Sequence, residues 1–194
     1  MLLLILAVLG YLVGAVPVGV LVARAVGAED PRGAGSGNVG ATNVTRVAGR
    51  RAGLVTLAGD AGKGALPVLL AAGCGLGPSG QALVGVAAVV GHVFPVTLGW
   101  SGGKGVATGG AVFLVLAPVA TLAAVLVYAA AFAATRTSSV GSLAGAATLL
   151  VGLTVGGAAL PVLLAALAVV ALVVVRHRDN IRRLRSRQEL GVLP

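Results

Sequence analysis

Long, uninterrupted apolar segments constrain this chain more than any other feature. The first runs from Leu2 to Ala23 without a charged residue, and later ones cover 106–134 and 140–175. About 20 apolar residues are enough to cross a lipid bilayer. Only 10% of the residues are charged, whereas about a quarter are charged in a soluble domain. The sequence therefore predicts an all-α integral membrane protein rather than a pair of soluble domains.

The basic residues predict the orientation of this protein in the membrane. The formal net charge is +9, and the cations gather in short segments between apolar runs: 24–51, Lys104, Arg136 and 176–187. The positive-inside rule places such segments in the cytoplasm, which explains the charge better than nucleic-acid binding does. We expect about seven short transmembrane helices, with the N-terminus outside and the C-terminus in the cytoplasm.

The two longest apolar runs determine the number of crossings. As one helix, residues 106–134 would be roughly 43 Å long at about 1.5 Å per residue, against a hydrocarbon core of about 30 Å. We expect a turn near Pro118 in this run, and a second turn at Gly156, Gly157 and Pro161 in the next run. Unsplit runs would give five crossings, and that alternative stays open.

The chain is expected to form one polytopic domain over residues 1–194. Its cytoplasmic segments are three motif loops and a basic tail, at 27–51, 101–105, 135–142 and 176–194. The first apolar run lacks a preceding basic segment and is longer than the apolar part of a signal peptide, so we interpret it as a retained span. Cys74 is the only cysteine, which excludes an intrachain disulfide.

A glycine-rich segment from Gly35 to Asn43 is a candidate phosphate site. Glycines let successive backbone N–H groups converge on an anion. A helix that starts near Thr42 would add the positive end of its dipole. Arg46 follows Asn43 by three residues, so both side chains would share one helix face. An ordinary polar loop with a helix cap is the alternative explanation.

Gly102-Gly103-Lys104-Gly105 is a second candidate. It lacks the GxxxxGK[ST] spacing of a Walker A loop, and a lysine here can simply mark the cytoplasmic side. The same ambiguity holds for Lys63, whose pairing with Asp60 three residues earlier is the simpler explanation.

Both histidines are candidate functional residues. Ionisable groups in membrane segments are often functional, although a lone histidine such as His92 is often just hydrogen-bonded. His177 and Asn180 are three residues apart and would share a helix face. Ser142, six residues after Arg136, could lie near the same surface. The five acidic residues form no cluster for paired metal ions, so no metal and no cofactor are expected.

Four segments together resemble the PlsY family of acyl-phosphate-dependent glycerol-3-phosphate acyltransferases. They are Ser36–Asn43 with Arg46, Gly59–Gly64 with Pro67, Gly91–Pro95 with Gly102–Thr108, and Arg176-His177 with Asn180-Ile181. They occur in family order and at family spacing across nearly the whole chain.

The resemblance implies transfer of an acyl group from acyl phosphate to the sn-1 hydroxyl of glycerol 3-phosphate. The products are 1-acyl-glycerol 3-phosphate and phosphate, and this is the first acylation of phospholipid synthesis. It also implies a multi-pass protein of the plasma membrane whose active site faces the cytoplasm. The partners are then the two substrates and membrane lipids, with no nucleic acid and no cofactor.

Candidate site residues follow from these motifs. We expect catalytic roles for Ser36, Asn38, Lys104 and His177. We expect substrate binding by Gly37, Thr42, Asn43, Arg46, Lys63, His92, Gly102, Gly103, Gly105, Thr108, Ser142 and Asn180. The proton acceptor is either His177 or the acyl phosphate itself.

Two other functions stay open at this point. A transporter of a phosphorylated metabolite would also need broken helices and cations, but no internal repeat is found. A lipid-binding scaffold would explain the basic tail but not the polar motifs far from it.

Overall fold

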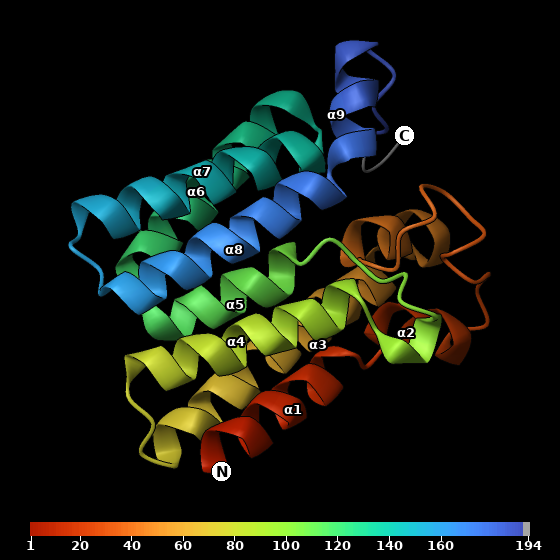
Figure 1. The fold of residues 1–194 in the computed structure, drawn as a ribbon. Coiled ribbons are helices and arrows are strands. Elements are labelled where there is room, and N and C mark those ends of the chain that lie inside the picture. Colours follow the sequence, from red (N-terminus) through yellow and green to blue (C-terminus); the bar gives the residue numbers. More distant parts are fainter. Residues whose placement is uncertain (192–194) are drawn as a thin grey trace.

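The computed structural model describes residues 1–191, and every regular element within that range is helical (Figure 1). The helices are α1 (Leu2–Gly14), α2 (Val18–Ala25), α3 (Ala41–Gly73), α4 (Pro78–Val93), α5 (Val106–Leu116), α6 (Pro118–Thr135), α7 (Ser138–Val155), α8 (Leu160–Arg176) and α9 (Arg178–Arg185). A short 3-10 turn, η1 (Val96–Leu98), precedes the loop that carries Lys104. The expected all-α fold is confirmed over this range.

Five segments of the described chain are long and apolar enough to cross a membrane: Leu2–Ala25, Ala41–Gly73, Pro78–Leu98, Pro118–Thr135 and Ser138–Val155. A sixth arises within residues 1–191 if α8 and α9, which are bent by 53°, are counted as one span. The 11 residues of α5 reach only about 16 Å at about 1.5 Å per residue. The seven crossings and the orientation of the termini therefore stay predictions.

Proline positions explain where three helices begin. Pro78, Pro118 and Pro161 each occupy the first or second position of their helix, where proline's missing N–H is not needed. The expected turns near Pro118 and at Gly156-Gly157-Pro161 are confirmed, because α5 gives way to α6 at Ala117 and α7 gives way to α8 over residues 156–159.

The helices differ from the expected segments in three places. The first apolar run breaks before Pro17 into α1 and α2, because proline cannot continue the hydrogen bonding of α1. Residues 27–51 are not one loop, since α3 begins at Ala41 and only kinks at Gly49, whose φ is 86°. Likewise, α7 begins at Ser138 within the expected loop 135–142.

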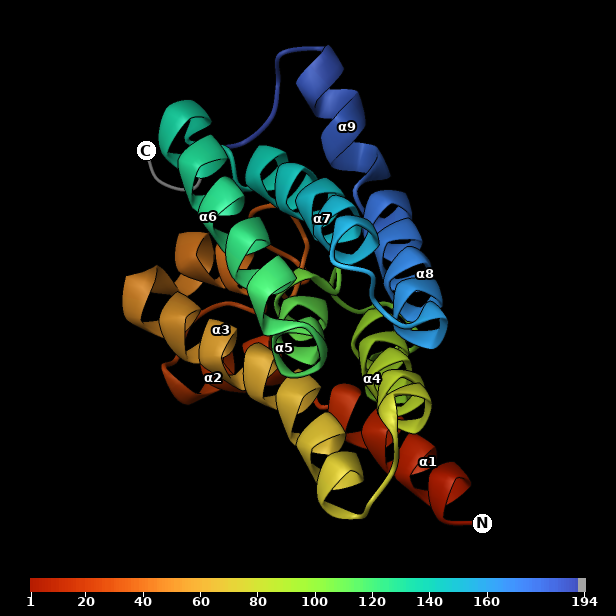
Figure 2. The ribbon, with the colours of Figure 1, turned by 90° about the vertical axis from the view of Figure 1, so that its left-hand side faces the viewer.

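The helices form one bundle in which sequence neighbours mostly pack together (Figure 2). The antiparallel pair α6–α7 makes the most extensive contact, and α1 packs on α4. Helices α4 and α5 both contact α8, which joins the first half of the chain to the second. The apolar core at this junction includes the buried side chains Val89, Val112, Phe113 and Val173.

Close helix contacts depend on small residues. A Cβ atom on Gly91 of α4 would lie 2.1 Å from the carbonyl oxygen of Tyr11 in α1, so only glycine allows the two backbones this approach.

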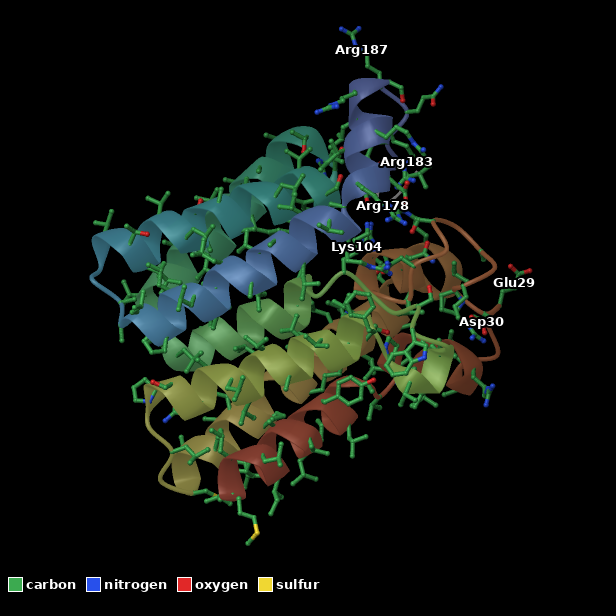
Figure 3. All side chains as sticks on the ribbon, viewed as in Figure 1. Glu29, Asp30, Lys104, Arg178, Arg183 and Arg187 are labelled. Carbon is green, nitrogen blue, oxygen red and sulfur yellow. The ribbon has the colours of Figure 1, made fainter. Side chains whose placement is uncertain are left out.

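Polar and apolar surfaces are separated along the bundle. Large apolar side chains such as Leu4, Val119, Leu126 and Val155 are more than two-thirds exposed, which suits a surface that faces lipid. Figure 3 shows the labelled charged residues, from Glu29 to Arg187, gathered at one end of the molecule, and Figure 1 shows the N-terminus at the other end. The bundle thus presents a single polar end, and the candidate site lies beneath it.

Candidate active site

A cavity of about 450 Å³ opens among α3, α5, α6, α7 and α8. At the polar end of the bundle it is lined by hydroxyl, amide and cationic side chains, whereas farther in its walls are alanine, glycine, valine, leucine and phenylalanine. Eleven of the residues expected in the site line it: Ser36, Asn38, Thr42, Asn43, Arg46, His92, Lys104, Gly105, Ser142, His177 and Asn180. The fold therefore brings together residues that are up to 144 positions apart in the chain, from 36 to 180.

Lys104 is one of the cations that line the cavity at this polar end. It lies in the loop before α5, and its Nζ donates a hydrogen bond of 2.5 Å to Oδ1 of Asn180 in α9. Burial lowers the pKa of Lys104 to about 8, while the carboxylate of Glu189 opposes that effect. A lysine in such surroundings is charged at neutral pH and gains from the approach of an anion.

His177 lies between α8 and α9, and its side chain is buried. Its Nδ1 is 2.7 Å from the carbonyl oxygen of Val173. Because a carbonyl only accepts, the proton of the neutral ring lies on Nδ1 and Nε2 carries the lone pair. Burial and, next, the positive charge of Lys104 lower the pKa of His177 to about 4. His177 is therefore neutral at pH 7 and is a weak base.

The C-terminal segment folds back over the polar end. The carboxylate of Glu189 accepts hydrogen bonds from Asn180 Nδ2 (2.5 Å), Ser139 Oγ (2.9 Å) and Arg183 Nε (2.8 Å). Burial opposes ionisation of Glu189, but these three hydrogen bonds outweigh it and lower its pKa.

Arg46 is held by the same segment. Its guanidinium donates to the carbonyl oxygens of Gly191 (2.9 Å) and Leu190 (3.1 Å). The Glu189 carboxylate thus occupies Asn180, and two backbone carbonyls occupy Arg46, although the sequence suggested both side chains for binding substrate.

Asn43 organises the loop before α3. Its Oδ1 accepts the N–H of Ser36 at 2.7 Å, and its Nδ2 donates to the carbonyls of Pro31, Ala34 and Asn38 at 2.9–3.0 Å. The side chain is almost fully buried. Asn43 therefore fixes the shape of the loop that presents Ser36 and Asn38 to the cavity. The helix expected near Thr42 is confirmed at Ala41.

The Gly102–Gly105 loop does not form the expected cradle of backbone N–H groups at its first two residues. The N–H groups of Gly102 and Gly103 point inward, to the carbonyls of Val93 and His92, at 3.1 Å each. On the other side, Arg176 donates to the carbonyls of Gly102 (2.8 Å) and Gly103 (3.2 Å). The loop is therefore clamped between α4 and α8, and it offers the cavity the Lys104 side chain instead of converging amides.

Five residues expected to bind substrate do not line the cavity: Gly37, Lys63, Gly102, Gly103 and Thr108. Lys63 donates to the carbonyl of Val16 at 2.8 Å and pairs with Asp60 at 2.9 Å. Thr108 is fully buried and donates to the carbonyl of Asp60 at 3.0 Å. These polar side chains hold helices together, a role that sequence spacing alone does not distinguish from ligand binding.

Sequence reasoning missed several lining residues. Tyr128, Ser138, Ser139 and Glu189 line the cavity, and Ser138 Oγ lies 3.1 Å from Thr42 Oγ1 and 3.2 Å from the Tyr128 hydroxyl. The run Thr137-Ser138-Ser139 was a usable signal, because three hydroxyls open a helix beside the basic Arg136.

The arrangement suits a substrate that is anionic at one end and apolar along its length. Lys104 and Arg46 supply positive charge, the amide of Asn180 and several hydroxyls supply hydrogen bonds, and the deeper walls supply apolar contact. Among residues 1–191 no group of three or more His, Cys, Asp and Glu side chains is placed to hold a metal ion.

Comparison with known proteins points in the same direction. The family described as glycerol-3-phosphate acyltransferase matches residues 4–187. A glycerol-3-phosphate acyltransferase of Anaeromyxobacter sp. strain Fw109-5 is 50% identical over 186 residues, covering 93% of this chain and 92% of the relative. The glycerol-3-phosphate acyltransferase of Myxococcus xanthus is 52% identical over 190 residues, covering 95% of this chain and 96% of the relative.

Two solved structures share the fold. The crystal structure of PlsY (YgiH), an integral membrane glycerol 3-phosphate acyltransferase, in its glycerol 3-phosphate form has a TM-score of 0.94 and 37% identity, and the match covers 98% of this chain and 96% of that one. The lysophosphatidic acid form of PlsY has a TM-score of 0.91 and 35% identity, and covers 98% and 95%.

Proposed function

The chain belongs to the glycerol-3-phosphate acyltransferase family and is an integral membrane acyltransferase, and from this premise we propose its donor, its site and its mechanism. The donor is acyl phosphate, the acceptor is the sn-1 hydroxyl of glycerol 3-phosphate, and the products are 1-acyl-glycerol 3-phosphate and phosphate. The reaction takes place in the cavity beneath the polar end, which faces the cytoplasm. Family membership leaves the transporter alternative without support.

One observation carries this proposal: Lys104, Arg46, Asn180 and His177 converge at the polar end of a cavity whose deeper walls are apolar. Both proposed substrates carry a phosphate, and one also carries an acyl chain. Cationic and amide groups stabilise phosphate oxygens by charge-assisted hydrogen bonds. The apolar walls accept the acyl chain, which stays in apolar surroundings as it passes between the bilayer and the cavity.

Substrate phosphate has to displace the contacts that the C-terminal segment makes. Glu189 holds Asn180, and the carbonyls of Leu190 and Gly191 hold Arg46. A phosphate dianion binds the same donors more strongly than a carbonyl does. Glycerol 3-phosphate binding is therefore coupled to movement of residues 189–191.

Acyl transfer proceeds by direct attack. The sn-1 oxygen bonds to the acyl carbonyl carbon, the bond from that carbon to the phosphate oxygen breaks, and the hydroxyl proton leaves with the phosphate. Phosphate is a good leaving group, so no acyl-enzyme is needed. Ser36 and Asn38, presented by the loop that Asn43 holds, stabilise the developing oxyanion.

The proton goes to an oxygen of the acyl phosphate. With a pKa of about 4, His177 is too weak a base to compete well with a phosphate oxygen. Its Nε2 instead accepts a hydrogen bond from the attacking hydroxyl and orients it.

The donor is tested by mixing purified protein with glycerol 3-phosphate and either acyl phosphate or acyl-coenzyme A of the same chain length. We expect stoichiometric release of phosphate and formation of 1-acyl-glycerol 3-phosphate only with acyl phosphate. Efficient transfer from acyl-coenzyme A would contradict the proposed donor. A sample without protein measures the non-enzymatic hydrolysis of acyl phosphate, and Lys104→Ala serves as the matched protein control.

A further inference from the structure

Three titratable side chains lie in the interior of the bundle, and two of them, Asp60 and His92, line the same cavity as Lys104. Asp60 and Lys63 come from α3 and His92 from α4, and their exposed fractions are 2%, 7% and 5%. All three belong to segments long and apolar enough to cross a membrane. Ionisable groups in such segments are costly and therefore call for a specific role.

The contacts of Lys63 account for the burial of its charge. Its Nζ pairs with Asp60 Oδ1 at 2.9 Å and donates to the carbonyl of Val16 at 2.8 Å. Val16 lies at the break between α1 and α2, where carbonyl groups have lost their helical partners. Lys63 thus secures the broken first span, whereas His92 is not explained in this way.

His92 has an unsatisfied nitrogen. Its Nδ1 is the one buried side-chain nitrogen or oxygen of residues 1–191 that lacks a hydrogen-bond partner. The atom lies 3.6 Å from Asp60 Oδ1, slightly beyond hydrogen-bond distance. Buried polar atoms rarely stay unpaired. Hydrogen bonds of an active site are often long without substrate and shorten when it binds, so we expect the contact between His92 and Asp60 to shorten in the substrate complex.

The imidazole of His92 supports the loop that carries Lys104. A Cβ atom on Gly103 would lie 2.0 Å from His92 Nε2, so the ring packs directly on the glycine backbone. The carbonyl of His92 also accepts the N–H of Gly103 at 3.1 Å. Beyond the loop, Thr108 at the start of α5 donates to the carbonyl of Asp60 at 3.0 Å. Both ends of the Lys104 loop therefore rest on Asp60 and His92.

We propose that Asp60 is a positioning residue for substrate phosphate, which it influences through His92 and the Lys104 loop. When substrate phosphate is bound, the Asp60 carboxylate accepts the Nδ1 proton of His92, fixes the tautomer and orientation of the ring, and so sets the positions of Gly103 and Lys104. A carboxylate that orients an imidazole in this way is a common device behind functional groups. The inference rests on the proposed role of Lys104 in binding phosphate.

The test removes the carboxylate without leaving a buried charge. Asp60→Asn alone would strand Lys63, so the variant is Asp60→Asn with Lys63→Met, in which both charges are lost together. Its matched control is Thr56→Val, which removes a fully buried hydroxyl one turn earlier in α3, away from the cavity. Both proteins are purified as full chains, and their thermal unfolding in detergent is recorded beside their kinetics.

We expect the paired variant to lose about 10- to 100-fold in kcat/KM, mainly through a higher KM for glycerol 3-phosphate, as for other groups that orient a binding residue. The Thr56→Val control should keep its KM. When the paired substitution is added to Lys104→Ala, the further loss should be less than about threefold, because residues that act through one another are not additive.

A normal KM in the folded paired variant would overturn the inference. A loss in kcat/KM that multiplies with the loss of Lys104→Ala would also overturn it, because the effects of independent structural damage add in free energy. If the paired variant unfolds, His92→Phe, which removes the nitrogen and retains a ring, is measured in the same cycle with the same two outcomes. Near-normal activity of Lys104→Ala is a different result, because it overturns the proposed phosphate site itself.

Discussion

Alkaline pH should weaken glycerol 3-phosphate binding through Lys104. The pKa of this lysine is lowered from 10.5 to about 8. Its side chain is therefore mostly a charged ammonium below pH 8, and it loses the proton as the pH rises above 8. The pH dependence of kcat/KM reports groups of the free enzyme. The protonated fraction is about nine-tenths at pH 7 and about one-tenth at pH 9, so kcat/KM should fall about tenfold between them if only the ammonium binds.

The comparison with Lys104→Arg isolates this effect. A guanidinium stays charged throughout this range, so the variant should have a lower kcat/KM at pH 7 but no decline between pH 7 and 9. The assay is the initial rate of phosphate release at limiting glycerol 3-phosphate and saturating acyl phosphate, with the rate of spontaneous hydrolysis subtracted at each pH. A flat wild-type profile up to pH 9.5, or the same decline in both proteins, would refute the assignment to Lys104.

The remaining predictions concern the loop, the histidine and the topology. Gly103→Ala should greatly reduce activity because its Cβ would lie 2.0 Å from the neighbouring imidazole, whereas Gly62→Ala, whose Cβ meets nothing within 4 Å, should have normal kinetics; equal activities would contradict this. With a pKa of about 4, His177 should remain neutral down to about pH 5 by NMR of ring-labelled protein, and a titration near pH 6.5 would show that the burial argument is wrong. In a cysteine-free background, Gly77→Cys should react with an impermeant thiol reagent in whole cells and Ser138→Cys should not, and external labelling of the latter would exclude the proposed orientation.

The sequence was sufficient to predict an all-helical membrane protein and two of the breaks between its helices. A run of 29 residues, 106–134, is too long for one crossing, and Pro118 offers a place to turn, so length and proline chemistry agreed. The break before Pro17 was missed because Leu2–Ala23 has a suitable length for a single span. Helix α3 begins at Ala41, inside the segment 27–51 that was expected to be a loop, because the glycines and charged residues of that segment lack the apolar character of a membrane span.

The candidate site was predictable where chemistry is local and was not where it depends on tertiary contact. Lys104 and Asn180 are 76 residues apart, and their hydrogen bond cannot be read from spacing. The Asn43 amide serves the backbone of its own loop, although the same residue type in a glycine-rich segment also suits phosphate binding. Glu189 was set aside as an isolated acid, because nothing in the sequence brings residue 189 back to the cavity.

The central claim is that the cavity around Lys104 binds substrate phosphate. It is tested most directly by the kcat/KM for glycerol 3-phosphate of Lys104→Ala, measured at pH 7 and normalised to folded protein. A hydrogen bond to a charged group contributes about 1.5–3 kcal/mol, which corresponds to a loss of roughly 10- to 150-fold at about 1.4 kcal/mol per decade. Lys104→Arg should recover only part of this loss, because a planar guanidinium does not replace a compact ammonium. A Lys104→Ala protein with near-normal kcat/KM would contradict the claim.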